Sequence, residues 1–169
     1  QTPQMFASMS LRDNVVVGTT PLGTMSLAQV AFGLPRIRNE ERDFADKADH
    51  WLDFVGARHL ADELAGNLPF GNLRLGELAR ALASSPKILL MDEPAAGLSR
   101  AETQRLRELL FKIRDTGVTI LIVEHNMPLI MSTADQVYVL DKGRLLAGGT
   151  PAAIQNDASV QKAYLGIAE

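Results

Sequence analysis

The sequence lacks cysteine, a surplus of basic residues and any long apolar run. Because none of its 169 residues is cysteine, the chain can form neither a disulfide framework nor a cysteine-ligated metal site. The formal net charge of −3 argues against nucleic acid as a partner, since no basic surface is left to neutralise phosphates. The apolar runs are only a few residues long, as in VTILIV at 118–123, whereas a membrane-spanning helix needs about 20. These absences leave a globular protein with no membrane-spanning segment.

Two apolar runs flank an amphipathic helix in the second half of the chain. Residues 88–91 (ILLM) and 118–123 predict strands that are buried on both faces of a parallel sheet. Between them, Ser99 and Glu102 match a capping box that opens a helix, and Gly117 fits the position just after its end. Because a strand–helix–strand crossover is right-handed in nearly all proteins, both strands are predicted to run parallel and to end at one edge of the sheet.

The other elements are predicted from caps, periodicity and breakers. Ser10 and Asp13 indicate a capped helix over 10–18, and Thr150 with Pro151 indicates the start of another, followed by an Ala-rich C-terminal helix. Further helices are expected over 36–54, 73–84 and 127–134, and a third strand over 136–140 that turns at 141–143 into 144–147. Residues 18–33 have no firm period and are expected to form a loop or a weak helix.

Charged side chains follow both predicted parallel strands. Asp92 and Glu93 come directly after the first strand, and Glu124 and His125 directly after the second. In open α/β sheets, ligands bind at the carboxyl ends of the strands. One carboxylate there can hold Mg²⁺, a second can activate water, and a histidine can contact a phosphate. Asp92, Glu93 and His125 fit those roles in that order.

Each of these residues alone also has a simpler explanation. Adjacent acids after a strand often cap a helix, a lone histidine at a strand end is mostly structural or solvated, and Ser99 is well explained as a helix cap. The joint placement of LLMDEP at 89–94 and LIVEH at 121–125 on neighbouring parallel strands is much harder to explain without a shared site.

With these motifs the chain resembles the ATPase subunit of ABC transporters, and within that family the subunits of branched-chain amino acid uptake systems. ILLMDE at 88–93 resembles the Walker B strand, AAGLS at 95–99 the D-loop, and His125 the switch histidine. LPFGN at 68–72 sits where the signature motif of the family belongs.

The resemblance extends to both ends of the chain. Residues 2–18 resemble the stretch after the Q-loop glutamine, which places Gln1 at that glutamine, and residues 149–166 are typical of the branched-chain amino acid group. The family implies an incomplete P-loop NTPase fold of the α/β class, with a parallel core sheet, flanking helices and a helical subdomain. Residues 1–85 would form the Q-loop and helical subdomain, 86–150 the C-terminal part of the core, and 151–169 a helical tail.

The family also implies roles for individual residues. ATP and Mg²⁺ would be the cofactors, Glu93, His125 and Gln1 catalytic residues, and Asp92 with Gln1 the ligands of the metal. The nucleotide-binding residues would be Leu68, Pro69, Phe70, Gly71, Asn72, Gly97 and Ser99.

The implied partners are a second ATPase subunit, integral membrane permease subunits and, indirectly, a substrate-binding protein. Residues 1–8 and the helical segment up to Gly66 would face the permease subunits. The protein is therefore expected at the cytoplasmic face of the inner membrane, as a peripheral subunit.

The chain departs from the family pattern at several positions. Pro69, Phe70 and Asn72 replace Ser, the first Gly and Gln of Leu-Ser-Gly-Gly-Gln, and Ser99 replaces the usual D-loop aspartate. No Gly-x-x-x-x-Gly-Lys-Ser/Thr occurs, since none of the five lysines follows a glycine, so the phosphate-binding loop is absent from these residues. We therefore expect this chain to be the C-terminal part of a longer subunit. By itself, this part should bind ATP poorly and hydrolyse hardly any.

Two alternatives remain open at this point. One is an ATPase of the same superfamily that serves translation or DNA repair rather than transport. The other is a non-catalytic binding module, which the missing phosphate loop favours and the presence of both Glu93 and His125 disfavours.

Overall fold

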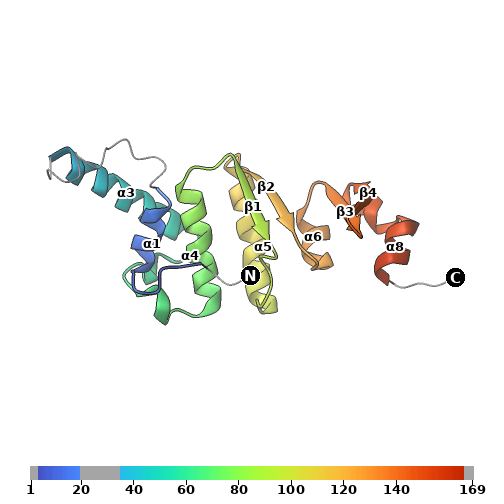
Figure 1. Cartoon of the computed structure of the whole chain (residues 1–169), viewed down its shortest axis with the longest axis horizontal. Helices are drawn as coiled ribbons and strands as arrows, with labels where there is room; N and C mark the ends of the chain where they lie inside the picture. The colour runs from blue at the N-terminus through green and yellow to red at the C-terminus, as the bar shows by residue number, and fades with distance from the viewer. Residues whose placement is uncertain (1–3, 20–34, 166–169) are drawn as a thin grey trace.

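The computed structural model describes residues 4–19 and 35–165. Figure 1 shows three groups of elements in a row along the longest axis of the molecule. The helices α1 (Leu11–Val17), α3 (Pro35–Phe54) and α4 (Phe70–Ala83) form the first group. The second group has the strands β1 (Ile88–Asp92) and β2 (Thr119–Val123) with the helix α5 (Arg100–Asp115). Most of the segment 18–33, predicted as loop or weak helix, lies outside the described residues.

The first three helices pack around one apolar core. As predicted, Ser10 caps α1 by accepting a hydrogen bond from the backbone N–H of Asp13. Leu11 and Leu52 are fully buried, and Leu82 of α4 joins them in the same cluster. The chain returns from α3 to α4 through the short 3₁₀ helices η2 (Arg58–Leu60) and η3 (Ala65–Asn67). Buried aliphatic side chains from all three helices therefore hold this group together.

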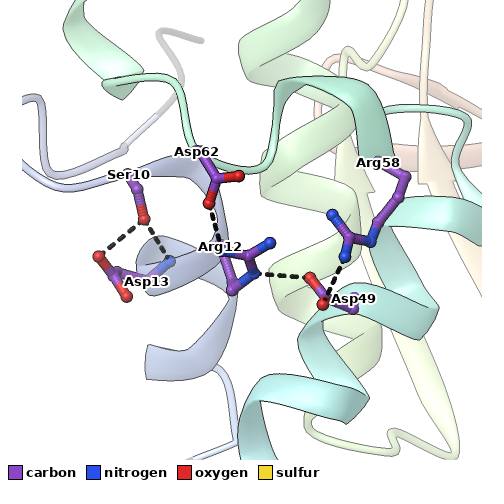
Figure 2. A network of polar contacts seen from close by, with 6 residues as sticks. All are labelled: Ser10, Arg12, Asp13, Asp49, Arg58 and Asp62. Atoms are coloured by element: carbon purple, nitrogen blue, oxygen red, sulfur yellow. Dashed lines mark hydrogen bonds and ion pairs between the residues drawn. The ribbon is translucent and has the colours of Figure 1, made fainter.

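A network of charged side chains joins α1, α3 and the η2 segment, as Figure 2 shows. The Arg12 guanidinium of α1 donates to Asp49 of α3 at 2.7 Å and also bonds Asp62, which follows η2. Asp49 accepts a second bond, of 2.8 Å, from Arg58. Both carboxylates raise the pKa of Arg12, mainly through the hydrogen bond to Asp49. The network fixes the position of α1 relative to α3 and to η2.

The predicted strand–helix–strand unit is confirmed. β1 and β2 pair in parallel, with Ile88 opposite Thr119 and Asp92 opposite Val123. The predicted capping box opens α5. The Ser99 side chain accepts a bond from the Glu102 N–H, and the Glu102 side chain accepts one from the Ser99 N–H. Gly117 follows the helix with φ +89°, a left-handed conformation that costs glycine little.

The prediction that these strands are buried on both faces is wrong for this chain. One face packs on α5, where Leu106 and Leu110 are buried against the β2 residues Ile120 and Ile122. On the other face, Leu90 is 70% exposed and Leu121 is 56% exposed. The apolar composition of the strands predicts a sheet that is covered on both faces. Among the described residues, however, a helix covers only one face.

The C-terminal group follows the predicted order. It contains α6 (Met127–Thr133), the antiparallel hairpin of β3 (Val137–Asp141) and β4 (Arg144–Gly149), and the helices α7 (Pro151–Gln155) and α8 (Ala158–Leu165). The hairpin forms a sheet separate from β1 and β2. Thr150 caps α7, with Pro151 as its first residue, as predicted. Among the described helices, none has the length and apolar character needed to cross a membrane.

Replacing Leu110 by alanine tests the one-sided core. We expect Leu110→Ala to lower the free energy of unfolding of this chain by about 3 kcal/mol, because it leaves a cavity between α5 and the sheet. Urea unfolding followed by circular dichroism measures this change. The matched control is Leu121→Ala, on the exposed face, which should cost less than about 1 kcal/mol. Equal losses for both variants would contradict the one-sided burial.

Replacing Ser99 by alanine tests the capping box. Hydrogen bonds from Ser99, first that of its side chain and then that of its backbone N–H, hold the pKa of Glu102 below its usual value. An ionised Glu102 therefore stabilises the fold above its usual pKa, and this contribution is lost as the pH falls through the lowered pKa. Ser99→Ala should raise the pKa of Glu102, as measured by carboxyl NMR titration. An unchanged pKa of Glu102 would rule out the Ser99 hydroxyl as the main cause of its lowered pKa. The control is Ser8→Ala, which changes an exposed serine elsewhere in the chain.

Candidate functional site

Glu93 and His125 meet beyond the carboxyl ends of β1 and β2. Glu93 Oε1 lies 3.4 Å from His125 Nδ1. The Glu93 N–H donates to the Val123 carbonyl at 2.8 Å, which continues the pairing of the strands by one residue. Glu93 has φ +44°, a conformation that is strained for a residue with a side chain and that is concentrated at functional sites. The structure thus brings Glu93 and His125 together, two of the four charged residues that the sequence placed at this edge.

Asp92 is the last residue of β1 and its side chain is at an exposed position. Within residues 4–19 and 35–165, no group of three or more histidine, aspartate or glutamate side chains could hold a metal ion. Mg²⁺ in phosphate-binding enzymes often takes only one or two carboxylates, with phosphate oxygens and water as the remaining ligands. An exposed aspartate at a strand end fits such a partial metal site. Gln1, the second expected ligand, lies outside the described residues.

The segment expected to be the signature motif forms the N-terminal end of α4. The helix begins at Phe70, earlier than the predicted residue 73, because the carbonyl of Pro69 accepts bonds from the N–H groups of Asn72 and Leu73. Leu68 precedes this cap, and Pro69 makes no side-chain capping bond. The last helical residues are as predicted, before Pro86. A 14-residue helix thus presents its N-terminal dipole at this end.

The signature segment contacts the turn that follows β1. Gly97, with φ +75°, leaves room for the Phe70 ring, which would be 3.4 Å from a Cβ at that position. Gly71 lies directly against the Glu102 carboxylate, so that a Cβ at Gly71 would collide with it. Glu102 is itself fixed by Ser99 through the capping box. Phe70, Gly71, Gly97 and Ser99 therefore form one cluster.

A cavity of about 400 Å³ lies between α4, β1 and α5. Its wall includes Gly71 and Asn72 from the start of α4 and Asp92 from the end of β1. Charged groups of both signs also line it: Arg74, Glu77, Glu102 and Arg105. Glu93 and His125 are not among the lining residues. The cavity thus joins two of the expected nucleotide-binding positions to the expected metal ligand but not to the Glu93–His125 pair.

The sequence did not predict the contacts of Glu124. Its side chain is 1% exposed, and it accepts hydrogen bonds from the N–H groups of Ala95, His125 and Asn126 at 2.8–2.9 Å. The contact between Glu102 and Gly71 was also not foreseen. The sequence showed only an acidic residue next to His125. That position does not predict which backbone N–H groups the Glu124 carboxylate contacts.

Two family models match this chain, one at each end. The model described as "ABC transporter" matches residues 1–96. The model described as "Branched-chain amino acid ATP-binding cassette transporter" matches residues 144–169.

Curated relatives align over nearly the whole chain. One is the high-affinity branched-chain amino acid transport ATP-binding protein BraF of Pseudomonas aeruginosa, 41% identical over 99% of this chain. Another is the corresponding protein LivG of Salmonella typhimurium, 37% identical over 99% of this chain. The lipopolysaccharide export system ATP-binding protein LptB of Escherichia coli is 31% identical over 98%. The chain spans 66% of the length of BraF and of LivG.

Solved structures share the fold. An ATP-binding cassette of an ABC transporter in its ADP conformation superposes with a TM-score of 0.78 at 30% identity, over 98% of this chain and 66% of that one. A nucleotide-free ATP-binding cassette gives a TM-score of 0.77 at 30% identity, over 100% of this chain and 67% of that one. The fold is therefore that of the P-loop NTPases. Because the ABC transporter family model matches residues 1–96 and the chain superposes on these cassettes, the chain belongs to the ABC transporter family of ATP-binding proteins.

Proposed function

We propose that the chain is part of an ATP-binding and ATP-hydrolysing subunit that powers an ABC importer for branched-chain amino acids. The observation that carries this proposal is the approach of Glu93 to His125, 3.4 Å apart, at the common end of two parallel strands in a chain of this family. The transport of branched-chain amino acids is taken from BraF and LivG, whose names state it. The match over residues 144–169 supports the same group.

Glu93 is proposed to activate the water that attacks the γ-phosphate of ATP. Its carboxylate is 29% exposed, so it remains accessible to water while its backbone is held by Val123. A carboxylate that accepts a proton from the attacking water acts as a general base. His125 Nδ1 lies beside the same carboxylate. In the imidazolium form both ring nitrogens are donors, so Nδ1 would face Glu93 while Nε2 donates to a phosphate oxygen.

Asp92, together with Gln1, is proposed to hold Mg²⁺ when nucleotide is bound. The metal would neutralise charge on the β- and γ-phosphate oxygens. Asp92 suits this task because its carboxylate is exposed and is anchored by the pairing of β1 with β2.

The N-terminal end of α4 is proposed to bind the nucleotide held by a second ATPase subunit. Leu68, Pro69, Phe70, Gly71 and Asn72 lie at this end, and Gly97 and Ser99 lie beside them. Pro69 has no hydroxyl to offer, so the backbone N–H groups and the helix dipole would provide most of the binding to phosphate. Asn72 can still donate through its side-chain amide.

The surface that contains Phe6 and Leu64 is proposed to contact the permease subunits. Phe6 is 52% exposed and Leu64 is 46% exposed. Backbone bonds from Ala65 to Met9 and from Gly66 to Ala7 hold the two segments together. The Asn14 side chain fixes Phe6 by bonding its N–H at 2.7 Å and its carbonyl at 3.0 Å. A rigid backbone with exposed apolar side chains suits a protein interface.

The proposal places the subunit at the cytoplasmic face of the inner membrane. It would act there with a second ATPase subunit, the permease subunits and, indirectly, a substrate-binding protein. The similarity to LptB, whose name assigns it to lipopolysaccharide export, makes an export system the second candidate. Uptake of labelled leucine by cells that lack the gene distinguishes the two, since only an importer of branched-chain amino acids predicts reduced uptake.

Replacing Glu93 by glutamine in the complete transporter tests the catalytic assignment. We expect kcat for ATP hydrolysis to fall by about 10²- to 10⁴-fold, because the general base is lost. The affinity for ATP should be little changed, since the amide has the same shape. A phosphate-release assay and a nucleotide-binding titration measure the two quantities.

Glu108→Gln is the matched control, because Glu108 is exposed on α5 and accepts a bond only from Gln104 among the bonds described. It should hydrolyse ATP at the wild-type rate. Normal turnover by Glu93→Gln would refute the assignment of Glu93 as the base.

Replacing Phe6 by glutamate tests the permease surface. We expect transport to be lost, since a charge would enter an apolar interface, while hydrolysis by the isolated subunit remains at the wild-type rate. Uptake into proteoliposomes and the hydrolysis of the subunit alone measure the two effects. Phe6→Leu, which keeps the apolar character, should retain transport. Full transport by Phe6→Glu would exclude this surface.

A further inference from the structure

The Glu124 carboxylate contacts two separate turns of the site. Oε1 accepts a hydrogen bond from the N–H of Ala95 at 2.9 Å, in the turn after β1. Oε2 accepts from the N–H groups of His125 at 2.8 Å and Asn126 at 2.9 Å, in the turn after β2. The side chain is only 1% exposed. A buried carboxylate is costly unless it is hydrogen-bonded, and here both oxygens have backbone donors.

These bonds continue the link between the strands beyond the end of the sheet. The last backbone bond between the two strand ends joins the Glu93 N–H to the Val123 carbonyl. Two residues further along the first turn, Ala95 bonds Glu124 instead. Glu93, with its strained φ of +44°, therefore lies between two cross-links to the β2 side. A strained conformation persists only where its surroundings fix it.

The second turn does not need Glu124 to begin its helix. Asn126 already caps α6, because its side-chain oxygen accepts a bond of 3.1 Å from the N–H of Leu129. The bonds of Glu124 Oε2 lie just before this cap, at the residue that carries the imidazole. Their effect is to fix the backbone of His125 relative to Ala95.

We propose that Glu124 is a positioning residue, which sets the separation of Glu93 and His125 by joining their two turns through three backbone N–H groups. This inference rests on the proposed function for its effect on ATP hydrolysis, but not for the existence of the link. Glu93 and His125 are 3.4 Å apart, and a misplacement of about 1 Å in a catalytic pair can lower the rate by about 10²-fold.

The test is Glu124→Gln in the complete protein. Glutamine has the same shape but only one acceptor oxygen, so its NH₂ group must face the N–H donors of one of the two turns. We expect kcat for ATP hydrolysis to fall by about 10- to 100-fold, with KM for ATP changed by less than about twofold. Glu108→Gln should leave both values at wild type.

Amide exchange measured by NMR tests the link without any use of ATP. In Glu124→Gln, the exchange of at least one of the three amides, those of Ala95, His125 and Asn126, should become about tenfold faster or more. The Glu93 amide, which bonds the Val123 carbonyl, should exchange as before, and this internal control distinguishes a local change from unfolding.

The outcomes separate the two proposals. A lower kcat with faster exchange at these amides supports the positioning role. Unchanged exchange at all three amides, or faster exchange with a normal kcat, overturns it. A wild-type protein without ATP hydrolysis would refute the proposed function, and faster exchange in the variant would then still support the link that Glu124 forms.

Discussion

The parallel pairing of β1 with β2 is the constraint on which the site depends. Because the register places Asp92 opposite Val123, both strands end together, and the residues that follow them meet at one edge. Helix α5 imposes this arrangement, since it crosses from one strand to the next and buries Leu106 and Leu110 against the sheet. This pairing brings Glu93 and His125 to the same edge, although about 30 residues separate them in the chain.

Beyond the ends of the paired strands, hydrogen bonds of buried or capping carboxylates hold the turns in place. Glu124 joins the two turns through hydrogen bonds, and the Glu102 carboxylate, which is hydrogen-bonded to Ser99, lies against Gly71 at the start of α4. The second contact connects the first group of helices to the α/β unit. Each of these carboxylates is fixed by backbone N–H groups, which are rigid donors. The positions of the charged groups are therefore set by the backbone, as preorganisation of a site requires.

The exposed face of β1 and β2 shows how composition and structure can disagree. A strand made only of apolar residues predicts burial on both sides, whereas Leu90 and Leu121 are exposed here. The composition of a strand reflects every surface that it contacts in the complete protein. The chain spans 66% of the length of BraF and of LivG, so its strands and their coverings need not lie in the same 169 residues.

Local signals in the sequence determined the caps at Ser10, Ser99 and Thr150, the order of strands and helices, and the edge that carries Asp92, Glu93 and His125. These features follow from hydrogen bonds and periodicities within a few residues of each other, together with the handedness of one crossover. Only the tertiary structure decided the contact between Gly71 and Glu102 and the bond that Glu124 accepts from Ala95. Those depend on the distances between segments that are far apart in the chain, and such distances are set by side-chain packing, which leaves no local pattern in the sequence.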